Sequence, residues 1–180
     1  MSVNNYFGKI LTNRYAGSQS GLGTNPILND SYYANGSDDI DMDLVQAQVA
    51  DSIGSTYKLL TVPSNSRIHK LEMANEALGT GCTASVGVYY PAFLPSNIPL
   101  SGTVINATFF AAGVAVATAH DWASVLNSGG SNTLPLQQQN LWQALGLAQD
   151  PICDLDIVVT LSGAAVGTAG NIALKSENCI

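Results

Sequence analysis

Apolar and polar residues alternate along most of this chain in short runs that turn-forming residues separate. In residues 67–73 apolar side chains stand among charged ones, and residues 83–90 alternate apolar with small or polar ones. Alternation of period two places one face of a strand in a core and the other in water. Gly79 and Gly81 provide the positive-φ positions that a turn needs. We therefore predict a β-hairpin over residues 66–90 that organises the remaining strands.

The rest of the chain predicts more strands and one helix. Residues 120–126 are short enough for one helical turn or a packed loop. Residues 135–147 combine an apolar stripe with Pro135 in the first turn and Gly146 at the exit, which predicts a helix. We expect residues 176–180 to be a short tail. The predicted strands cover residues 57–62, 102–110, 156–161 and 171–175, with a first one in 39–50 and with 113–118 as an extension after a bulge or a separate strand. We expect the strand at 171–175 to pair with the one at 156–161.

About seven or eight short strands with one short helix indicate an all-β fold. Turn signals between closely spaced strands are typical of an antiparallel β-sandwich or a jelly roll. The chain has no repeated strand–helix–strand pattern, which argues against a parallel sheet. We expect residues 45–180 to form a jelly-roll-like domain and residues 1–44 to form an extended N-terminal arm.

The predicted arm is rich in turn formers but also in apolar and aromatic residues, which a disordered linker normally lacks. We interpret it as a segment that lies along another surface, either of its own subunit or of a neighbour. A tail with a few local anchors is the alternative. The candidate anchors are Tyr6, Phe7, Ile10, Tyr15, Tyr32 and Tyr33.

Composition narrows the possible partners. The formal charge is −7 and basic residues form no cluster, so we expect no binding to nucleic acid. Charged residues make up only 11%, against about 25% in an average domain, which suggests either a surface that meets other protein or a surface rich in Ser, Thr, Asn and Gly. No apolar run reaches the ~20 residues of a membrane helix, and the first residues do not resemble a secretory signal, so we expect no membrane contact.

Asp39, Asp41 and Asp43 would share one face of a strand, where three carboxylates could hold calcium. The residues that follow do not have the spacing of a calcium-binding loop. We favour an acidic, solvated strand edge that discourages aggregation.

The remaining candidates do not suggest catalysis. His120, Asp121 and Ser124 are the residue types of a nucleophilic triad, but they are near neighbours in sequence and lack the usual nucleophile turn. His69 is best explained as a residue of a polar strand face. We therefore expect no enzyme and no cofactor.

The three cysteines and two tryptophans have structural explanations. Cys82, Cys153 and Cys179 contain no close pair, so buried packing is more plausible than zinc binding or a disulfide framework. Trp122 and Trp142 could be platforms for a sugar, but both have apolar sequence neighbours, which favours core packing.

Residues 62–71, 75–81 and 86–89, and later 140–147, 156–165 and 168–174, resemble small structural proteins of tailed-bacteriophage virions. The resemblance covers about residues 55–175. It implies a decoration or cement protein with a jelly-roll-like fold, made in the host cytoplasm, that sits on the capsid surface and clamps neighbouring major capsid subunits. The partners it implies are the major capsid protein and further copies of this chain, as a dimer or trimer. A tail or neck protein and a glycan-binding sandwich on the virion remain alternatives.

Overall fold

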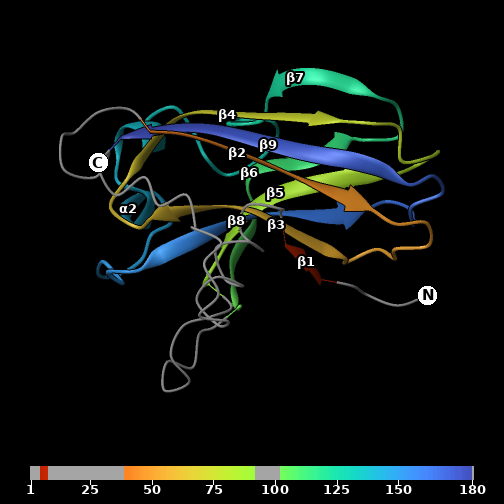
Figure 1. Cartoon of the computed structure of the whole chain (residues 1–180). Helices are drawn as coiled ribbons and strands as arrows, with labels where there is room; N and C mark the ends of the chain where they lie inside the picture. Colours follow the sequence, from red (N-terminus) through yellow and green to blue (C-terminus); the bar gives the residue numbers. More distant parts are fainter. Residues whose placement is uncertain (1–4, 8–38, 92–101, 180) are drawn as a thin grey trace, which may run out of the picture.

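The computed structural model describes residues 5–7, 39–91 and 102–179. They form two packed β-sheets, seen as two layers in Figure 1. The first sheet has the order β1-β3-β8-β5-β6 and the second β2-β9-β4-β7. The strands are β1 (Asn5–Phe7), β2 (Asp39–Ala47), β3 (Thr56–Pro63), β4 (Arg67–Asn75), β5 (Thr83–Tyr89), β6 (Val104–Ala115), β7 (His120–Ser124), β8 (Asp154–Ser162) and β9 (Gly170–Cys179).

The pairing of these strands is that of a jelly roll. β2 pairs with β9, β3 with β8, β4 with β7 and β5 with β6, as though one long hairpin had been rolled up. The all-β, jelly-roll-like class predicted from the sequence is confirmed. The strand β2 crosses the expected boundary between residues 44 and 45, because its residues from Asp39 on pair with β9.

The predicted hairpin over residues 66–90 is wrong in its pairing. Its two strands exist as β4 and β5, but they belong to opposite sheets. The link between them crosses the sandwich and places Leu78 in the core, fully buried. Gly79 and Gly81 do adopt positive φ, 106° and 81°. The same correction applies to β8 and β9, which we expected to pair and which also lie in opposite sheets.

The core lies between the two sheets and consists mainly of aliphatic side chains with a few aromatic ones. Tyr57 is fully buried and its hydroxyl donates a hydrogen bond to Asp51 at 2.8 Å. The rings of Phe109 and Phe110 meet edge to face. The largest fully buried side chains are Tyr57, Phe109, Phe110, Leu59, Leu71, Leu78, Leu155, Ile157, Leu161, Ile172, Leu174 and Val62.

The predicted helix over 135–147 is mostly absent. Only a 3-10 turn, η1 (Leu136–Gln138), and a four-residue helix, α2 (Leu141–Ala144), are present. The backbone of Asn140 is extended, and the amides of Leu141 and Trp142 donate to the carbonyls of Ser66 and Ser64 instead of continuing a helix. Short helices are only marginally stable alone, so these tertiary bonds decide the local structure. Gly146 ends the segment with φ of 72°, as expected.

The structure also decides the secondary structure of residues 113–115, residues 120–124 and the C-terminal end. Residues 120–124 form the edge strand β7 and not a helical turn or loop. Residues 113–115 extend β6, so the bulged long strand is correct there. The expected C-terminal tail is wrong up to Cys179, because β9 continues to that residue and pairs with both β2 and β4.

Candidate interaction surface

The residue types of a nucleophilic triad lie spread along β7, and all are exposed to solvent. His120 Nε2 lies 3.2 Å from Thr118 Oγ1. An exposed edge strand offers neither a water-excluding site nor an ordered base for a nucleophile. Among the residues that the structure describes, no group of three or more His, Cys, Asp or Glu side chains is placed to hold a metal ion.

The three cysteines occupy different environments. Cys82 is buried and its thiol contacts the carbonyl of Ala165 at 3.2 Å, in agreement with a packing role. Cys153 is half-buried; burial, followed by the nearby Asp154, Asp150 and Asp156 carboxylates, raises the pKa of its thiol. Cys179 is also half-buried, with its sulfur 2.8 Å from His69 Nε2. Cys153 packs against the core but is only partly buried, and Cys179 lies outside the core cluster, so the prediction of a buried packing residue holds in full only for Cys82.

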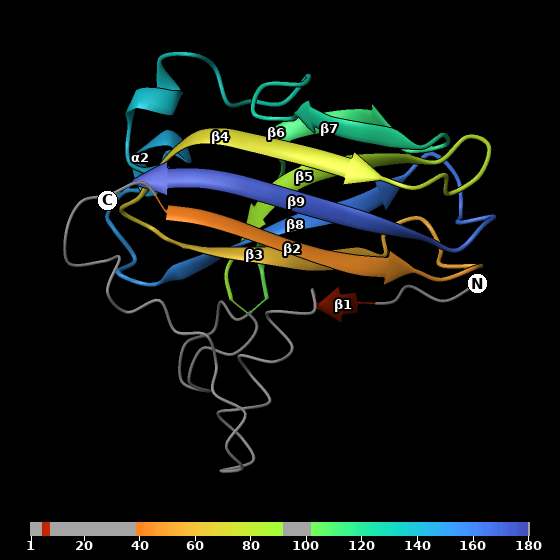
Figure 2. The same cartoon turned by 45° about the horizontal axis from the view of Figure 1, so that its top comes forward.

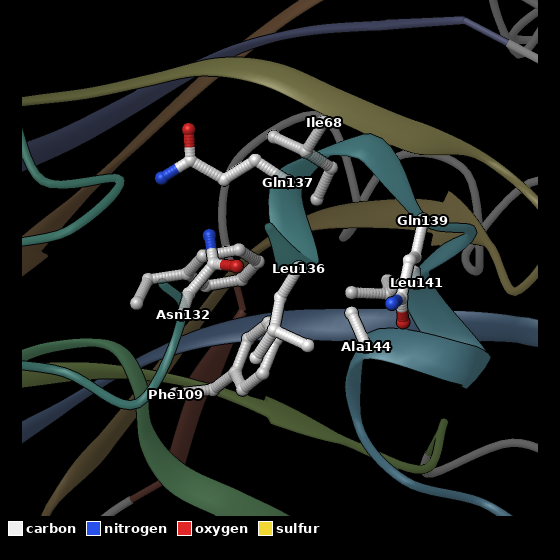
Figure 3. Close-up of a pocket in the computed structure, with 9 residues that line it drawn as sticks. Ile68, Phe109, Asn132, Leu136, Gln137, Gln139, Leu141 and Ala144 are labelled. Atoms are coloured by element: carbon white, nitrogen blue, oxygen red, sulfur yellow. The ribbon is translucent and has the colours of Figure 1, made fainter. Parts of the chain in front are cut away.

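The cavity at the α2 end of the sandwich is too small for an organic ligand. Figure 3 shows Leu136, Leu141 and Ala144 around it, with Phe109 and Asn132 on the opposite side. Its volume of about 10 Å³ corresponds to one water molecule. A second, open depression of about 510 Å³ lies at the other end of β4, beside His120 and Glu76.

The β2-β9-β4-β7 sheet is the front layer in Figure 2. Its outer face carries a closed ring of ion pairs. Lys70 Nζ lies 3.2 Å from Glu72 and 3.3 Å from Glu177, and Lys175 Nζ lies 4.0 Å and 3.7 Å from the same two carboxylates. The ammonium of Lys70 donates hydrogen bonds to Glu72 and Glu177. These bonds, of which the one to Glu72 has the larger effect, raise the pKa of Lys70. Strand register produces this ring, because Lys70 pairs with Glu177 and Glu72 with Lys175.

Beside this ring, the edge strand β2 has the reverse of the expected polarity. Ile40, Met42 and Leu44 point outward with exposed fractions of 60%, 50% and 44%. Asp43 is only 4% exposed, and its Oδ1 accepts a hydrogen bond from the amide of Leu44 at 2.7 Å. The prediction of a solvated acidic edge is therefore wrong for Asp43. The solvent-facing side of this strand is an apolar stripe.

The apolar character continues across the sheet in a row perpendicular to the strands. Leu44 pairs with Ala173, and Ala173 pairs with Ala74. On β7, Ser124 pairs with Glu72 and therefore points outward, and Trp122 shares its face by alternation. Trp122 is 42% exposed, so the expectation of core packing is wrong for it, whereas Trp142 in α2 is partly buried. We call this whole surface, from Ile40–Leu44 to Trp122, the outer face.

Of the six candidate arm anchors, the structure describes two. Tyr6 and Phe7 lie in β1, which pairs in parallel with β3, Tyr6 opposite Tyr57 and Phe7 opposite Lys58. The backbone of the chain at these residues thus adds to a sheet of its own subunit. The remaining anchors, Ile10, Tyr15, Tyr32 and Tyr33, lie outside the described residues.

A search for helices able to cross a membrane finds none in the described part of the chain. No family model matches the sequence, and no curated protein matches it either. Among solved structures the chain is similar to one in the cyanophage Pam1 capsid asymmetric unit, with 10% identity, a TM-score of 0.48, and 81% of this chain and 86% of that one covered. It is also similar to one in the capsid of Ralstonia phage GP4, with 14% identity, a TM-score of 0.48, and 78% and 84% covered. Both are phage capsids, the kind of particle to which the sequence resemblance pointed, but similarity at this level does not assign a function.

Proposed function

We propose that this protein is a structural component of a phage virion that binds the outside of the capsid and clamps neighbouring major capsid subunits. The observation that carries the proposal is the sequence resemblance over about residues 55–175. Nearly all of that region lies in the jelly-roll-like fold that the resemblance implies, over β3, β4, β5, β6, β8 and β9. A rigid sandwich with a low charge content suits a protein whose surface meets other protein.

Within the predicted arm, residues 8–38, which connect β1 to β2, are the part proposed to reach the capsid or a neighbouring copy. The root of the arm, β1, lies at the edge of the first sheet, so the chain that follows starts from a fixed point on the domain. Aromatic residues inserted into pockets of a partner are efficient anchors. On a symmetric lattice many individually weak contacts give strong attachment through effective concentration.

Reconstitution on particles tests this proposal. Virions lacking the protein are mixed with the purified chain, sedimented, and the bound copies are counted against the major capsid protein by mass spectrometry. We expect full-length protein to bind in hundreds of copies, and the deletion of residues 2–38 to remain folded but lose binding. A full-length variant with Tyr15, Tyr32 and Tyr33 replaced by alanine is the matched control for chain length, and we expect it to bind weakly. Unchanged occupancy of both variants would contradict a role for the arm.

The same count distinguishes a tail or neck protein, which would be present in a few copies per particle. The exposed Trp122 beside an open depression keeps the glycan-binding alternative testable. That alternative requires binding of soluble sugars that Trp122→Ala abolishes, measured by calorimetry on the isolated protein. Sugar binding together with a low copy number would replace the cement proposal.

A further inference from the structure

The charged ring on the outer face has a pattern that is complementary to itself. Across the two central strands, Glu177 stands beside Lys70 and Lys175 stands beside Glu72. Along each strand the charges also alternate, Lys175 then Glu177 on β9 and Lys70 then Glu72 on β4. This is a two-by-two checkerboard of opposite charges at the centre of the sheet.

A two-fold axis in the plane of the outer face, parallel to the strands and between β9 and β4, brings opposite charges together. A second copy related by this axis places its β4 over β9 of the first. Lys175 then faces Glu72 of the second copy, and Glu177 faces Lys70 of the second copy. The symmetry repeats each contact, which gives four ion pairs between copies in an isologous interface. Because these residues lie next to the axis, the twist of about 30° between packed sheets displaces them least.

The same operation matches the apolar residues. It places β2 over β7, so Leu44 meets Trp122 of the second copy, and Ala173 meets Ala74 of the second copy. The small side chains at Ala173 and Ala74 leave room for the bulky pair at the two edges. Contacts of an exposed leucine with a tryptophan supply the apolar burial that surface ion pairs alone do not.

We propose that two copies of this chain dock face to face through the outer face, with the charge checkerboard setting the register and Leu44 and Trp122 forming the apolar contacts. Four strands spaced about 4.8 Å apart and seven residues of each give a footprint of about 20 Å by 20 Å per copy. That is about 400 Å² per copy and about 800 Å² in total, below the ~1,200 Å² of standard interfaces, so we expect only weak self-association of the isolated protein, with a Kd of about 100 μM. The inference stands apart from the capsid proposal, because it concerns the free chain.

Charge-reversed variants test whether the charged surfaces of two copies meet. In one variant Lys70→Glu and Lys175→Glu make the checkerboard entirely acidic; in the other Glu72→Lys and Glu177→Lys make it entirely basic. Each variant alone should be monomeric by sedimentation velocity, with circular dichroism confirming the fold. An equimolar mixture should dimerise at least as tightly as the original protein. A mixture that remains monomeric overturns the proposed face-to-face contact, since folded variants of opposite charge must attract if these surfaces meet.

An apolar test uses Leu44→Asp, which we expect to weaken the dimer at least tenfold. The matched control is Ile152→Asp, because Ile152 is 89% exposed but lies in the loop before β8 of the other sheet. The control should leave association unchanged. If the original protein is monomeric at about 1 mM, a concentration that detects an association of about 4 kcal/mol, the dimer is refuted. If it is monomeric and Leu44→Asp abolishes particle binding, the outer face binds the capsid and not a second copy.

Discussion

Lys58 and Asp156 form a buried ion pair, which should couple their contributions to stability. Lys58 Nζ lies 3.7 Å from Asp156 Oδ2, and the two side chains are only 8% and 3% exposed. Thr61 Oγ1 donates a further hydrogen bond to Asp156 Oδ1 at 3.2 Å. At this distance and an effective dielectric constant of about 20, the attraction amounts to about 4 to 5 kcal/mol.

Desolvation of both ions offsets most of that attraction, but removal of one partner leaves the other charge buried. We expect Asp156→Asn or Lys58→Met alone to lower the free energy of unfolding by about 3 to 5 kcal/mol. For a chain of this length that corresponds to a drop in Tm of about 6 to 20 °C. The side-chain amide that Asp156→Asn introduces retains an acceptor for Thr61, so the loss reports mainly the charge.

Urea unfolding of the four proteins of the double-mutant cycle, followed by circular dichroism, measures the coupling directly. The double variant should lose much less stability than the sum of the two single variants. If the two single losses add, or if each is below about 1 kcal/mol, the buried pair behaves as an exposed one and the reasoning fails.

Three further predictions concern single positions. A Cβ on Gly87 would lie 2.3 Å from the carbonyl oxygen of Asn106 and 2.4 Å from the carbonyl carbon of Ala107, so Gly87→Ala should cost about 1 to 3 kcal/mol or more in unfolding experiments. Gly167→Ala, whose Cβ would meet nothing closer than 3.8 Å, is its control and should change stability by less than about 1 kcal/mol; equal losses would contradict the steric argument. Leu71→Ala in the core of β4 should cost about 2 to 5 kcal/mol, whereas Ile152→Ala should have almost no effect on the same unfolding curve. The raised pKa of Cys153 lowers its thiolate fraction at a given pH, so mass spectrometry should find it alkylated by iodoacetamide more slowly than a small free thiol, with a rate that levels off at a higher pH than that of the free thiol. Alkylation at the speed of the free thiol would show that burial does not act on this group.

The positions of most strands could be predicted from the sequence, because alternation is a local signal. Ile68, Leu71 and Met73 were assigned to a buried face and are buried. The irregular spacing of Ile68 and Leu71 reflects a register shift between Ile68 and Lys70, which returns Leu71 to the core. The pairing of the strands could not be predicted, because in a jelly roll most strands pair with strands distant in sequence. Thus β4 pairs with β9, about a hundred residues later, and not with β5, which follows it.

The candidate surface was less predictable than the fold. Aspartates and apolar residues alternate along β2, so the sequence pattern fits a strand with either set turned toward the core. Only the register with β9 decides that Met42 and Leu44 face outward and Asp43 faces inward. Lys70 and Glu72 could be recognised as a polar face, but their ion pairs with Lys175 and Glu177 depend on the neighbouring strand. Residues 120–124 lack a strand signal because every one of them is exposed at an edge.

The solvent sides of the two sheets differ in how much apolar surface they expose, which limits where a partner can bind. On the first sheet, outward positions between core residues are buried: Lys58 is 7% exposed, Asp156 2% and Val158 0%. Part of this cover comes from β6, whose backbone at Asn106 and Ala107 passes directly over Gly87, the residue opposite Val158. On the second sheet, the corresponding positions at Met42 and Leu44 are about half exposed. Among the described residues, a flat partner therefore finds apolar contact on the second sheet, while β1 roots the arm on the first. A dimer through the second sheet would leave both β1 edges uncovered, so that one assembly could carry two arms towards separate capsid subunits.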